Sequence, residues 1–301
     1  MDDRRPGPRA RALALLDALE GEKAADGAAR IGLTGAPGAG KSTLLDALVR
    51  TWRGRDETVG VIAVDPSSRR TGGALLGDRI RVRSGAGDPG VFFRSMAARD
   101  RLGGLADATR AGVVVMASVF DRVLVETVGV GQSESDVAGL VDTLVFVMQP
   151  GAGDLLQFMK AGVLELPDVF AVNKADLGPG AERTRSELEA GLGLGERAAA
   201  GWTPPVVPVS ARDGTGIEAL ATALDEHRAS LASSGELARR RRRGRDLFVE
   251  ESVLDAYGRF GLAALGGREA LRERLDADRD ASGFALADAL GREIEDALRK
   301  P

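Results

Sequence analysis

The chain has 301 residues, of which 44% are hydrophobic and 29% are charged, a composition typical of a folded globular protein. It has no cysteine and one histidine, His227, which excludes disulfides, thiolate nucleophiles, Cys-ligated zinc and histidine-cluster metal sites. The 41 basic and 45 acidic residues give a net charge of −4, which argues against binding nucleic acid through overall charge. Since the chain has neither a transmembrane-length apolar run nor a signal-peptide core, we expect a cytoplasmic protein that does not bind membranes.

Short apolar runs alternate with amphipathic stretches along most of the chain. Residues 10–20 place leucines at helical spacing and predict a short N-terminal helix. Six apolar runs read as strands, at 31–34, 58–64, 122–125, 143–148, 169–172 and 206–209. Helical patterns occur at 42–51, 103–118, 154–166 and 217–230. Alternating elements with strands apolar on both faces predict a doubly wound α/β fold with a mainly parallel sheet.

The composition changes near both ends of this α/β region. We expect an N-terminal helical segment at 1–29, an α/β domain at 30–230 and a C-terminal helical arm at 231–301. The arm contains the one basic block, Arg239–Arg243 with Arg245. Because no aromatic residues are interleaved, a solvated helix face or ion pairs with a second subunit explain this block better than nucleic-acid binding does.

A phosphate-binding motif follows the first predicted strand. The sequence GAPGAGKST has the G-x-x-x-x-G-K-S spacing of a P-loop and lies between a strand and a helix. Backbone N–H groups can cradle a phosphate, Lys41 can reach the β- and γ-phosphates, and the Ser42 hydroxyl can ligate Mg²⁺. The candidate phosphate-contacting residues are Gly35, Ala36, Pro37, Gly38, Ala39, Gly40, Lys41, Ser42 and Thr43.

Acidic residues beyond the P-loop are candidate ligands of the Mg²⁺ that a triphosphate needs. Glu126 ends a predicted strand and can hold the ion directly or through water, while Gly129 can offer its N–H to the γ-phosphate. Asp65 and Asp78 compete with Glu126 for the metal, and spacing alone favours Asp65 over Asp78. Gln132 is the candidate for orienting the attacking water, although a plain surface glutamine explains it equally well.

A second motif selects the base. Asn173-Lys174-Ala175-Asp176 follows a buried strand in the form N-K-x-D. The Asp176 carboxylate can accept hydrogen bonds from guanine, whereas adenine would leave it unpaired at a cost of about 1–3 kcal/mol. Asn173 can tie this segment to the phosphate loop, and the Lys174 stem can cover the base. Ser210-Ala211-Arg212 ends the last predicted strand, where a backbone N–H can donate to guanine O6, so we expect GTP and GDP as the bound nucleotides.

Six segments together resemble one family. They read GAPGAGKST (35–43), VDPSSRRTGGALLGDRIR (64–81), VETVGVGQSE (125–134), QPGAGDLLQFMKAG (149–162), NKAD (173–176) and PPVVPVSARDGTGI (204–217). They are similar to the methylmalonyl-CoA mutase-associated GTPases, the MeaB/ArgK/MMAA-type G-protein chaperones of adenosylcobalamin-dependent acyl-CoA mutases. The resemblance is strong over 30–230 and loose over the C-terminal arm.

This resemblance implies a P-loop NTPase fold and a GTPase that is slow alone and is stimulated by its partner. The GTPase would gate cofactor loading and the protection or reactivation of a methylmalonyl-, isobutyryl- or related mutase. The family pattern places Mg²⁺ near Ser42, Asp65, Asp78 and Glu126. It also implies an extra switch with Asp154, Gln157 and Lys160, and a homodimer formed by the arm, for which residues 247–257 offer an apolar face.

Two other classes remain as alternatives. A GTPase metallochaperone would need soft or imidazole ligands, which a chain with no cysteine and one histidine lacks. A GTP-dependent RNA-associated factor would need a basic face, and only the short arginine block could serve. Both fit the sequence less well than a mutase chaperone does.

Overall fold

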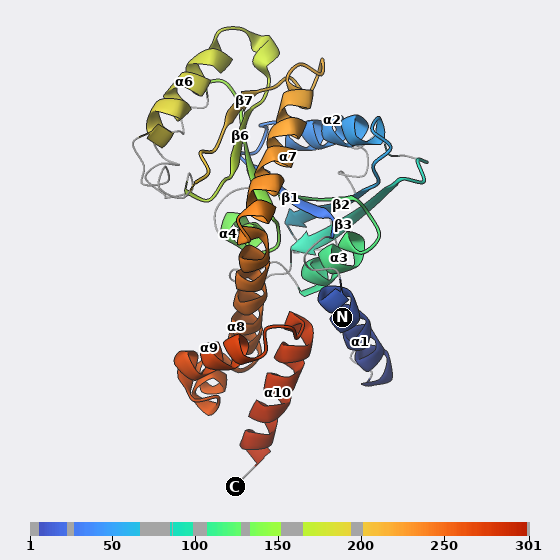
Figure 1. The fold of residues 1–301 in the computed structure, drawn as a ribbon, viewed down its shortest axis with the longest axis vertical. Coiled ribbons are helices and arrows are strands. Elements are labelled where there is room, and N and C mark those ends of the chain that lie inside the picture. Colours follow the sequence, from blue (N-terminus) through green and yellow to red (C-terminus); the bar gives the residue numbers. More distant parts are fainter. Residues whose placement is uncertain are drawn as a thin grey trace. The chain divides into compact units, whose positions relative to one another are not determined.

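The computed structural model describes residues 6–22, 27–66, 85, 87–98, 107–127, 133–151, 165–193 and 201–299 (Figure 1). The chain divides into two compact units, one of Ala28–Leu237 and the other of Met1–Gly27 together with Ala238–Pro301. The N-terminal and C-terminal helices therefore share a unit. The predicted three-part domain division stays a prediction. Among the described helices, none is both long and apolar enough to cross a bilayer.

A seven-stranded sheet, parallel throughout, forms the centre of the unit Ala28–Leu237. Its strands are β1 (Ala29–Gly35), β2 (Val59–Pro66), β3 (Val91–Ala98), β4 (Arg122–Thr127), β5 (Thr143–Met148), β6 (Val169–Val172) and β7 (Val206–Pro208). They lie in the order β3-β2-β4-β1-β5-β6-β7. From the neighbours β1 and β4 the chain continues in opposite directions across the sheet, so their carboxyl ends form the switch point where such sheets bind ligands.

The sequence predicts six of these strands and misses β3. This strand lies at the edge of the sheet, paired only with β2 among the described strands. Phe92 and Arg94 are exposed on it, and Arg94 and Ser95 end its apolar run after only three residues. A pattern tuned to strands buried on both faces therefore does not detect it.

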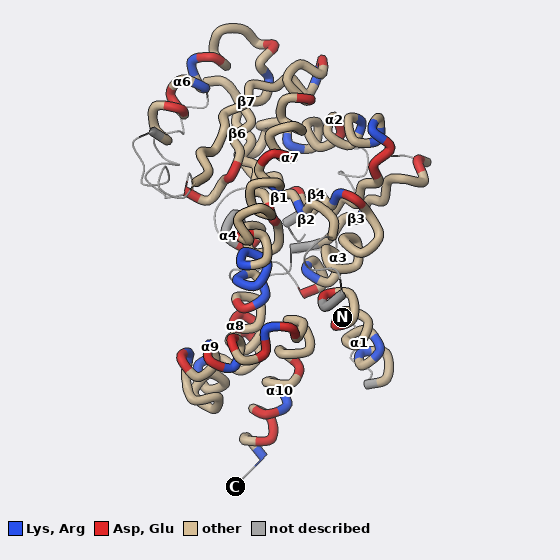
Figure 2. Tube along the Cα trace, in the orientation of Figure 1, with Lys and Arg blue, Asp and Glu red and all other residues tan. Residues whose placement is uncertain are grey.

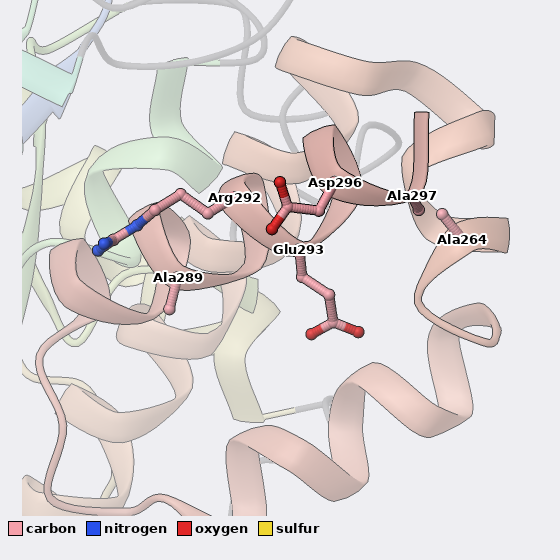
Figure 3. A pocket seen from close by; sticks show the side chains of 6 residues that line it. All are labelled: Ala264, Ala289, Arg292, Glu293, Asp296 and Ala297. Carbon is pink, nitrogen blue, oxygen red and sulfur yellow. The ribbon is translucent and has the colours of Figure 1, made fainter. Parts of the chain in front are cut away.

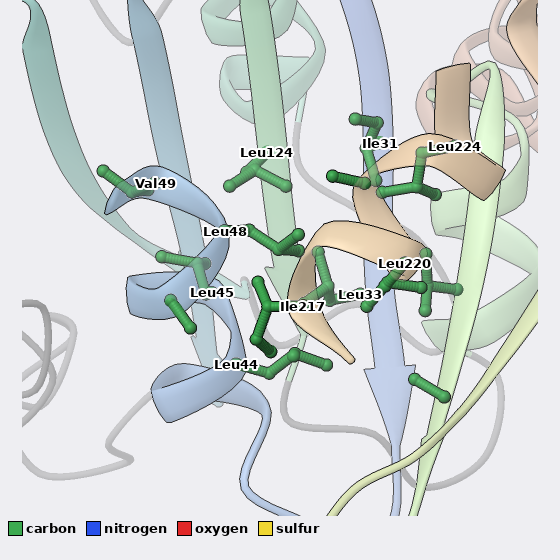
Figure 4. Packing of buried hydrophobic residues seen from close by; sticks show 14 of the residues in the cluster. Ile31, Leu33, Leu44, Leu45, Leu48, Val49, Leu124, Ile217, Leu220 and Leu224 are labelled. Carbon is green, nitrogen blue, oxygen red and sulfur yellow. The ribbon is translucent and has the colours of Figure 1, made fainter. Parts of the chain in front are cut away.

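Helices cover both faces of the sheet. On one face, α2 (Lys41–Arg53) and α7 (Ile217–Ser233) bury their leucines against β1 and β4 (Figure 4). On the other face lie α3 (Asp107–Ala117), α4 (Ser133–Ala138) and α6 (Gly180–Gly193). The sequence predicts α2, α3 and α7 but not the short α4 or the charge-rich α6. Most of the helix predicted at 154–166 lies outside the described residues.

The helices described in the other unit are α1 (Pro6–Glu22), most of α8 (Glu236–Ala264), which is kinked where Gly258 leaves the helical conformation, α9 (Gly267–Ala277) and α10 (Gly283–Arg299). The carboxylates of Asp17 and Glu20 on α1 accept the N–H groups of Ser282 and Gly283 at 3.3 and 2.9 Å. Two carboxylates of α1 thus cap the start of α10, where the helix dipole favours negative charge.

Several apolar side chains of α8 pack against other helices of this unit. Val249 and Val253 are 0% and 1% exposed and pack in one cluster with leucines of α9 and α10. The predicted dimer face at 247–257 is therefore wrong for these two valines. Leu247, Phe260 and Leu298 are exposed apolar residues of the same unit.

Arg245 departs from the rest of the basic block, which lies along α8 (Figure 2). Its side chain is buried, and its guanidinium donates to four backbone carbonyl oxygens, those of Leu275, Asp278, Arg279 and Ala281, at 2.9–3.1 Å. These carbonyls end α9 and form the turn into α10. For Arg245 the prediction of a solvated side chain is wrong, because it clamps this turn.

Replacing Arg245 with methionine keeps the apolar stem and leaves four carbonyls without their donor. We expect the helical unit to lose about 2–4 kcal/mol of stability, since buried acceptors without partners cost about 1–3 kcal/mol each and some regain water. Urea unfolding followed by circular dichroism measures the change. Arg299→Met is the matched control, because the Arg299 side chain is 75% exposed and pairs with Glu295 and Asp296 on its own helix. Equal unfolding midpoints for the two variants would contradict the clamp.

Candidate nucleotide site

The loop between β1 and α2 requires glycine at both of its ends. Gly35 has φ +138°, and a Cβ there would lie 2.1 Å from the carbonyl oxygen of Val147 on β5. Gly40 has φ +89°, and a Cβ there would lie 2.4 Å from Nδ2 of Asn173. The loop packs directly on β5 and on the loop that follows β6, so neither position has room for a side chain.

Lys41 gives this loop a buried positive charge. Its side chain belongs to a residue that is 7% exposed, and its Nζ donates to the carbonyl oxygens of Gly35 at 2.7 Å and Ala36 at 3.1 Å. Lys41 also begins α2, whose N-cap residue Gly40 supplies no side-chain cap. The ammonium and the uncapped helix N-terminus both favour an anion in the loop.

Ser42 and Glu126 meet beside the loop. The Ser42 hydroxyl donates to Oε1 of Glu126 at 2.7 Å, and Glu126 is 8% exposed. The parallel register pairs Leu33 of β1 with Glu126 of β4. Ser42, which follows β1 in the chain, and Glu126 therefore lie at the same end of the sheet. A hydroxyl and a carboxylate are hard oxygen ligands, so this pair fits the donor set that Mg²⁺ prefers.

The other candidate metal ligands are less well placed by the structure. The backbone of Asp65 lies at the end of β2, where Ala63 is in register with Glu126. The Asp65 side chain and the whole of Asp78 lie outside the described residues. Within the described part of the chain, no group of three or more His, Asp or Glu side chains comes close enough to hold a metal ion.

Asn173 joins three loops. Its Nδ2 donates to the carbonyl oxygens of Ala39 at 2.9 Å and Gly40 at 3.4 Å, and its Oδ1 accepts the backbone N–H of Ala211 at 3.1 Å. Asn173 is 2% exposed, so water competes little for these bonds. One buried amide thus fixes the phosphate loop against both N-K-x-D and the turn after β7. The Ala211 amide is therefore engaged with Asn173 rather than pointing freely at a base.

Asp176 is held at the open side of these loops. Its Oδ1 accepts the Ser210 hydroxyl at 2.9 Å, and the Arg212 guanidinium lies 3.8 Å from Oδ2. The Asp176 side chain is 19% exposed, whereas that of Arg212 is 85% exposed. Ser210 therefore orients the carboxylate and leaves lone pairs of both oxygens for donors of a ligand.

The turn after β7 is itself fixed by hydrogen bonds. The backbone N–H of Thr215, 2.9 Å from Oδ1 of Asp213, holds the pKa of Asp213 below its usual value. The Ser210 N–H donates to the carbonyl oxygen of Thr215 at 2.8 Å. Ser210 is thereby locked in the position from which it reaches Asp176.

The structure brings the candidate base and phosphate residues together but leaves several predicted residues untested. Gly129, Gln132, Asp154, Gln157 and Lys160 lie outside the described residues, as Asp78 does. One contact was missed by the sequence reasoning. Lys174 donates from Nζ to the carbonyl oxygen of Gly38 at 2.8 Å and to Oε1 of Gln149 at 2.6 Å. The sequence signals for Gln149 are its place directly after the strand at 143–148 and at the start of the segment 149–162, neither of which indicates a contact with Lys174.

A hollow of about 660 Å³ lies in the helical unit, and none of the candidate site residues lines it (Figure 3). It is lined by Ala264, Ala289, Arg292, Glu293, Asp296 and Ala297. Its charged side chains are paired within the unit, Arg292 with Asp288 at 2.5 Å and Glu293 with Arg274 at 2.7 Å. The hollow lacks the mainly apolar lining of a small-molecule pocket.

A model of the family described as Methylmalonyl Co-A mutase-associated GTPase MeaB matches residues 1–259. The chain belongs to the MeaB family of GTPases. The MeaB-family chain is 37% identical to GTPase ArgK of Escherichia coli over 243 residues, which are 79% of this chain and 72% of that protein. It is 36% identical to the mitochondrial methylmalonic aciduria type A homolog of Mus musculus over 235 residues, 76% of this chain and 57% of the mouse protein.

Solved structures agree with the MeaB-family fold. A crystal structure named LAO/AO transport system kinase superimposes with a TM-score of 0.66 at 25% identity, covering 99% of this chain and 90% of that one. HypB from Helicobacter pylori in complex with nickel superimposes with a TM-score of 0.52 at 16% identity, covering 74% of this chain and 96% of that one. The likeness to HypB shows the shared fold alone. The predicted α/β P-loop NTPase fold is confirmed.

Proposed function

We propose that this MeaB-family chain binds GTP and GDP with Mg²⁺, hydrolyses GTP slowly alone, and gates cofactor loading of an adenosylcobalamin-dependent acyl-CoA mutase. Protection or reactivation of that mutase is the other part of the proposed role. The proposal of nucleotide binding is supported best by the side-chain hydrogen bonds of Asn173. They join the phosphate loop to the N-K-x-D segment and to the turn after β7.

The carboxylate of Asp176 supports the choice of guanine. Ser210 holds one of its oxygens at 2.9 Å, and the side chain is 19% exposed. Guanine offers the N1–H and the exocyclic amine to such a carboxylate, whereas adenine offers an acceptor and no amine there. A carboxylate left unpaired beneath adenine would cost about 1–3 kcal/mol or more, so the site favours GTP over ATP.

The phosphate side supports a metal-dependent hydrolysis. Lys41 would exchange contacts with its own loop for contacts with phosphate oxygens, supplying charge where the loop N–H groups also point. Ser42 and Glu126 would hold Mg²⁺, with Asp65 and Asp78 as the further candidates from the family pattern. When bound, Mg²⁺ supplies positive charge to the triphosphate. The roles of Gly129 and Gln132, as γ-phosphate donor and water-orienting residue, rest on the sequence.

The partner proposal rests on the family. The description of the matching family names methylmalonyl-CoA mutase, and a mouse relative is named for methylmalonic aciduria. An isobutyryl-CoA mutase or a related mutase is the alternative partner. Asp154, Gln157 and Lys160 are proposed to couple the nucleotide site to that partner.

Assembly and location also stay proposals. For a homodimer, Leu15, Leu247, Phe260 and Leu298 are exposed apolar side chains of the helical unit that a second copy could cover. The cytoplasmic location is predicted from the sequence.

Replacing Asp176 with asparagine tests the base contact. We expect GDP to bind about 100-fold more weakly, because the amide cannot accept two hydrogen bonds from guanine. Xanthosine diphosphate should gain affinity, because the new N–H can donate to the carbonyl that xanthine carries in place of the amine. Titration calorimetry of both nucleotides measures the exchange. Unchanged preference for GDP in the variant would show that Asp176 does not read the base.

Addition of methylmalonyl-CoA mutase tests the proposed coupling. We expect GTP turnover to rise with mutase concentration and to saturate, because a bound partner would position the groups that act in hydrolysis or contribute one of its own. Phosphate release is measured with and without the mutase. A Lys41→Ala variant with the same mutase is the control for contaminating GTPases. Equal turnover at every mutase concentration would contradict the coupling to that enzyme.

A further inference from the structure

Gln149 and Lys174 form a contact between two strand ends. The Nζ of Lys174 donates to Oε1 of Gln149 at 2.6 Å and to the carbonyl oxygen of Gly38 at 2.8 Å. Gln149 directly follows β5, Lys174 lies two residues after β6, and Gly38 is in the phosphate loop. A single ammonium group therefore ties together three segments, and Gln149 is the acceptor on the β5 side.

The parallel register explains why Gln149 reaches Lys174. Met148 of β5 pairs with Val172 of β6, and the Asn173 N–H continues the ladder by donating to the Met148 carbonyl oxygen at 2.8 Å. Gln149 is the next residue after Met148, and Lys174 is the next residue after Asn173. The Gln149 side chain is half-buried, so the contact is only partly open to water.

The backbone at Lys174 makes this contact more than a surface hydrogen bond. Lys174 has φ 63°, a left-handed conformation that residues other than glycine seldom adopt. The next amide, that of Ala175, donates to the carbonyl oxygen of Val209 at 3.0 Å. Contacts on both sides hold this strained turn, and Asp176 lies two residues further on. Strain kept in this way is typical of a binding site.

We infer that Gln149 is a positioning residue of the guanine-nucleotide site. By accepting from the Lys174 ammonium, it holds the lysine stem across the site before a nucleotide arrives, and it slows release of the nucleotide. Without this acceptor, the lysine keeps only the Gly38 carbonyl and samples more rotamers, so that more order has to be imposed on binding. The inference rests on the proposed nucleotide function and adds a residue to it.

Gln149→Leu removes the acceptor while keeping a similar volume. We expect fluorescently labelled GDP to leave this variant about 5–10-fold faster than wild type in stopped-flow chase experiments with Mg²⁺, since a hydrogen bond to a charged group is lost. Gln149→Glu keeps an acceptor at the same reach and should release GDP at the wild-type rate or more slowly. Arg183→Ala, a change of an 83% exposed side chain on α6, is the neutral control.

A double-mutant cycle with Lys174→Met separates positioning from a general structural role. If Gln149 acts through Lys174, Gln149→Leu has no further effect on release once Lys174 is methionine. An equal acceleration in both backgrounds, or wild-type release from Gln149→Leu, would overturn the inference. Should the leucine variant fail to fold, Gln149→Asn replaces it in the cycle, because its shorter amide no longer reaches Lys174.

The wild-type measurement distinguishes this inference from the proposed function. If the wild-type chain binds no GDP at all, the proposed nucleotide function fails. If it binds GDP and only the Gln149 results disagree, the role of Gln149 fails while guanine-nucleotide binding stands.

Discussion

The side-chain amide of Asn173 contacts two segments that are distant in sequence. Ala39 lies 134 residues before Asn173, and Ala211 lies 38 residues after it. The amide donates to the phosphate loop and accepts from the turn after β7, and Asn173 is 2% exposed. Each buried donor or acceptor left without a hydrogen-bond partner costs about 1–3 kcal/mol of folding stability. The contacts of Asn173 therefore stabilise the three loops as one arrangement. Gly40 is part of the same constraint, since a Cβ there would lie 2.4 Å from the Asn173 amide nitrogen.

The order of the sheet makes this connection possible. All ladders are parallel, so every strand in the sheet delivers its following loop to the same edge. β1, β5, β6 and β7 are consecutive neighbours, which places the phosphate loop, Gln149, Asn173 and Ser210 side by side at that edge. On the other flank of β1, β4 brings Glu126 to Ser42. The residues proposed to contact the base, the phosphates and the metal therefore follow the ends of neighbouring strands.

Local sequence was enough to predict the parts of this arrangement that depend on local chemistry. Strands apolar on both faces, the glycines of the P-loop, and the link from Asn173 to that loop follow from residue type and spacing. Contacts that depend on the register of distant segments did not. β3 was missed because the apolar run of this edge strand ends at Phe93, before the polar Arg94 and Ser95. Arg245 looked like one arginine among many until α9 and its following turn were in place around it.

The chain belongs to the MeaB family, whose description names methylmalonyl-CoA mutase. Asn173 belongs to the N-K-x-D segment and its side chain contacts the phosphate loop. A displacement of either segment would therefore change the position of the other. We expect base selectivity to depend on Asn173, whose side chain contacts backbone atoms of the phosphate loop and of the turn after β7. Titration of Asn173→Ala with GDP and with ADP tests this most directly. The account predicts weaker GDP binding together with a smaller ratio of GDP to ADP affinity than in wild type. A variant that binds GDP more weakly but keeps the wild-type ratio would contradict it.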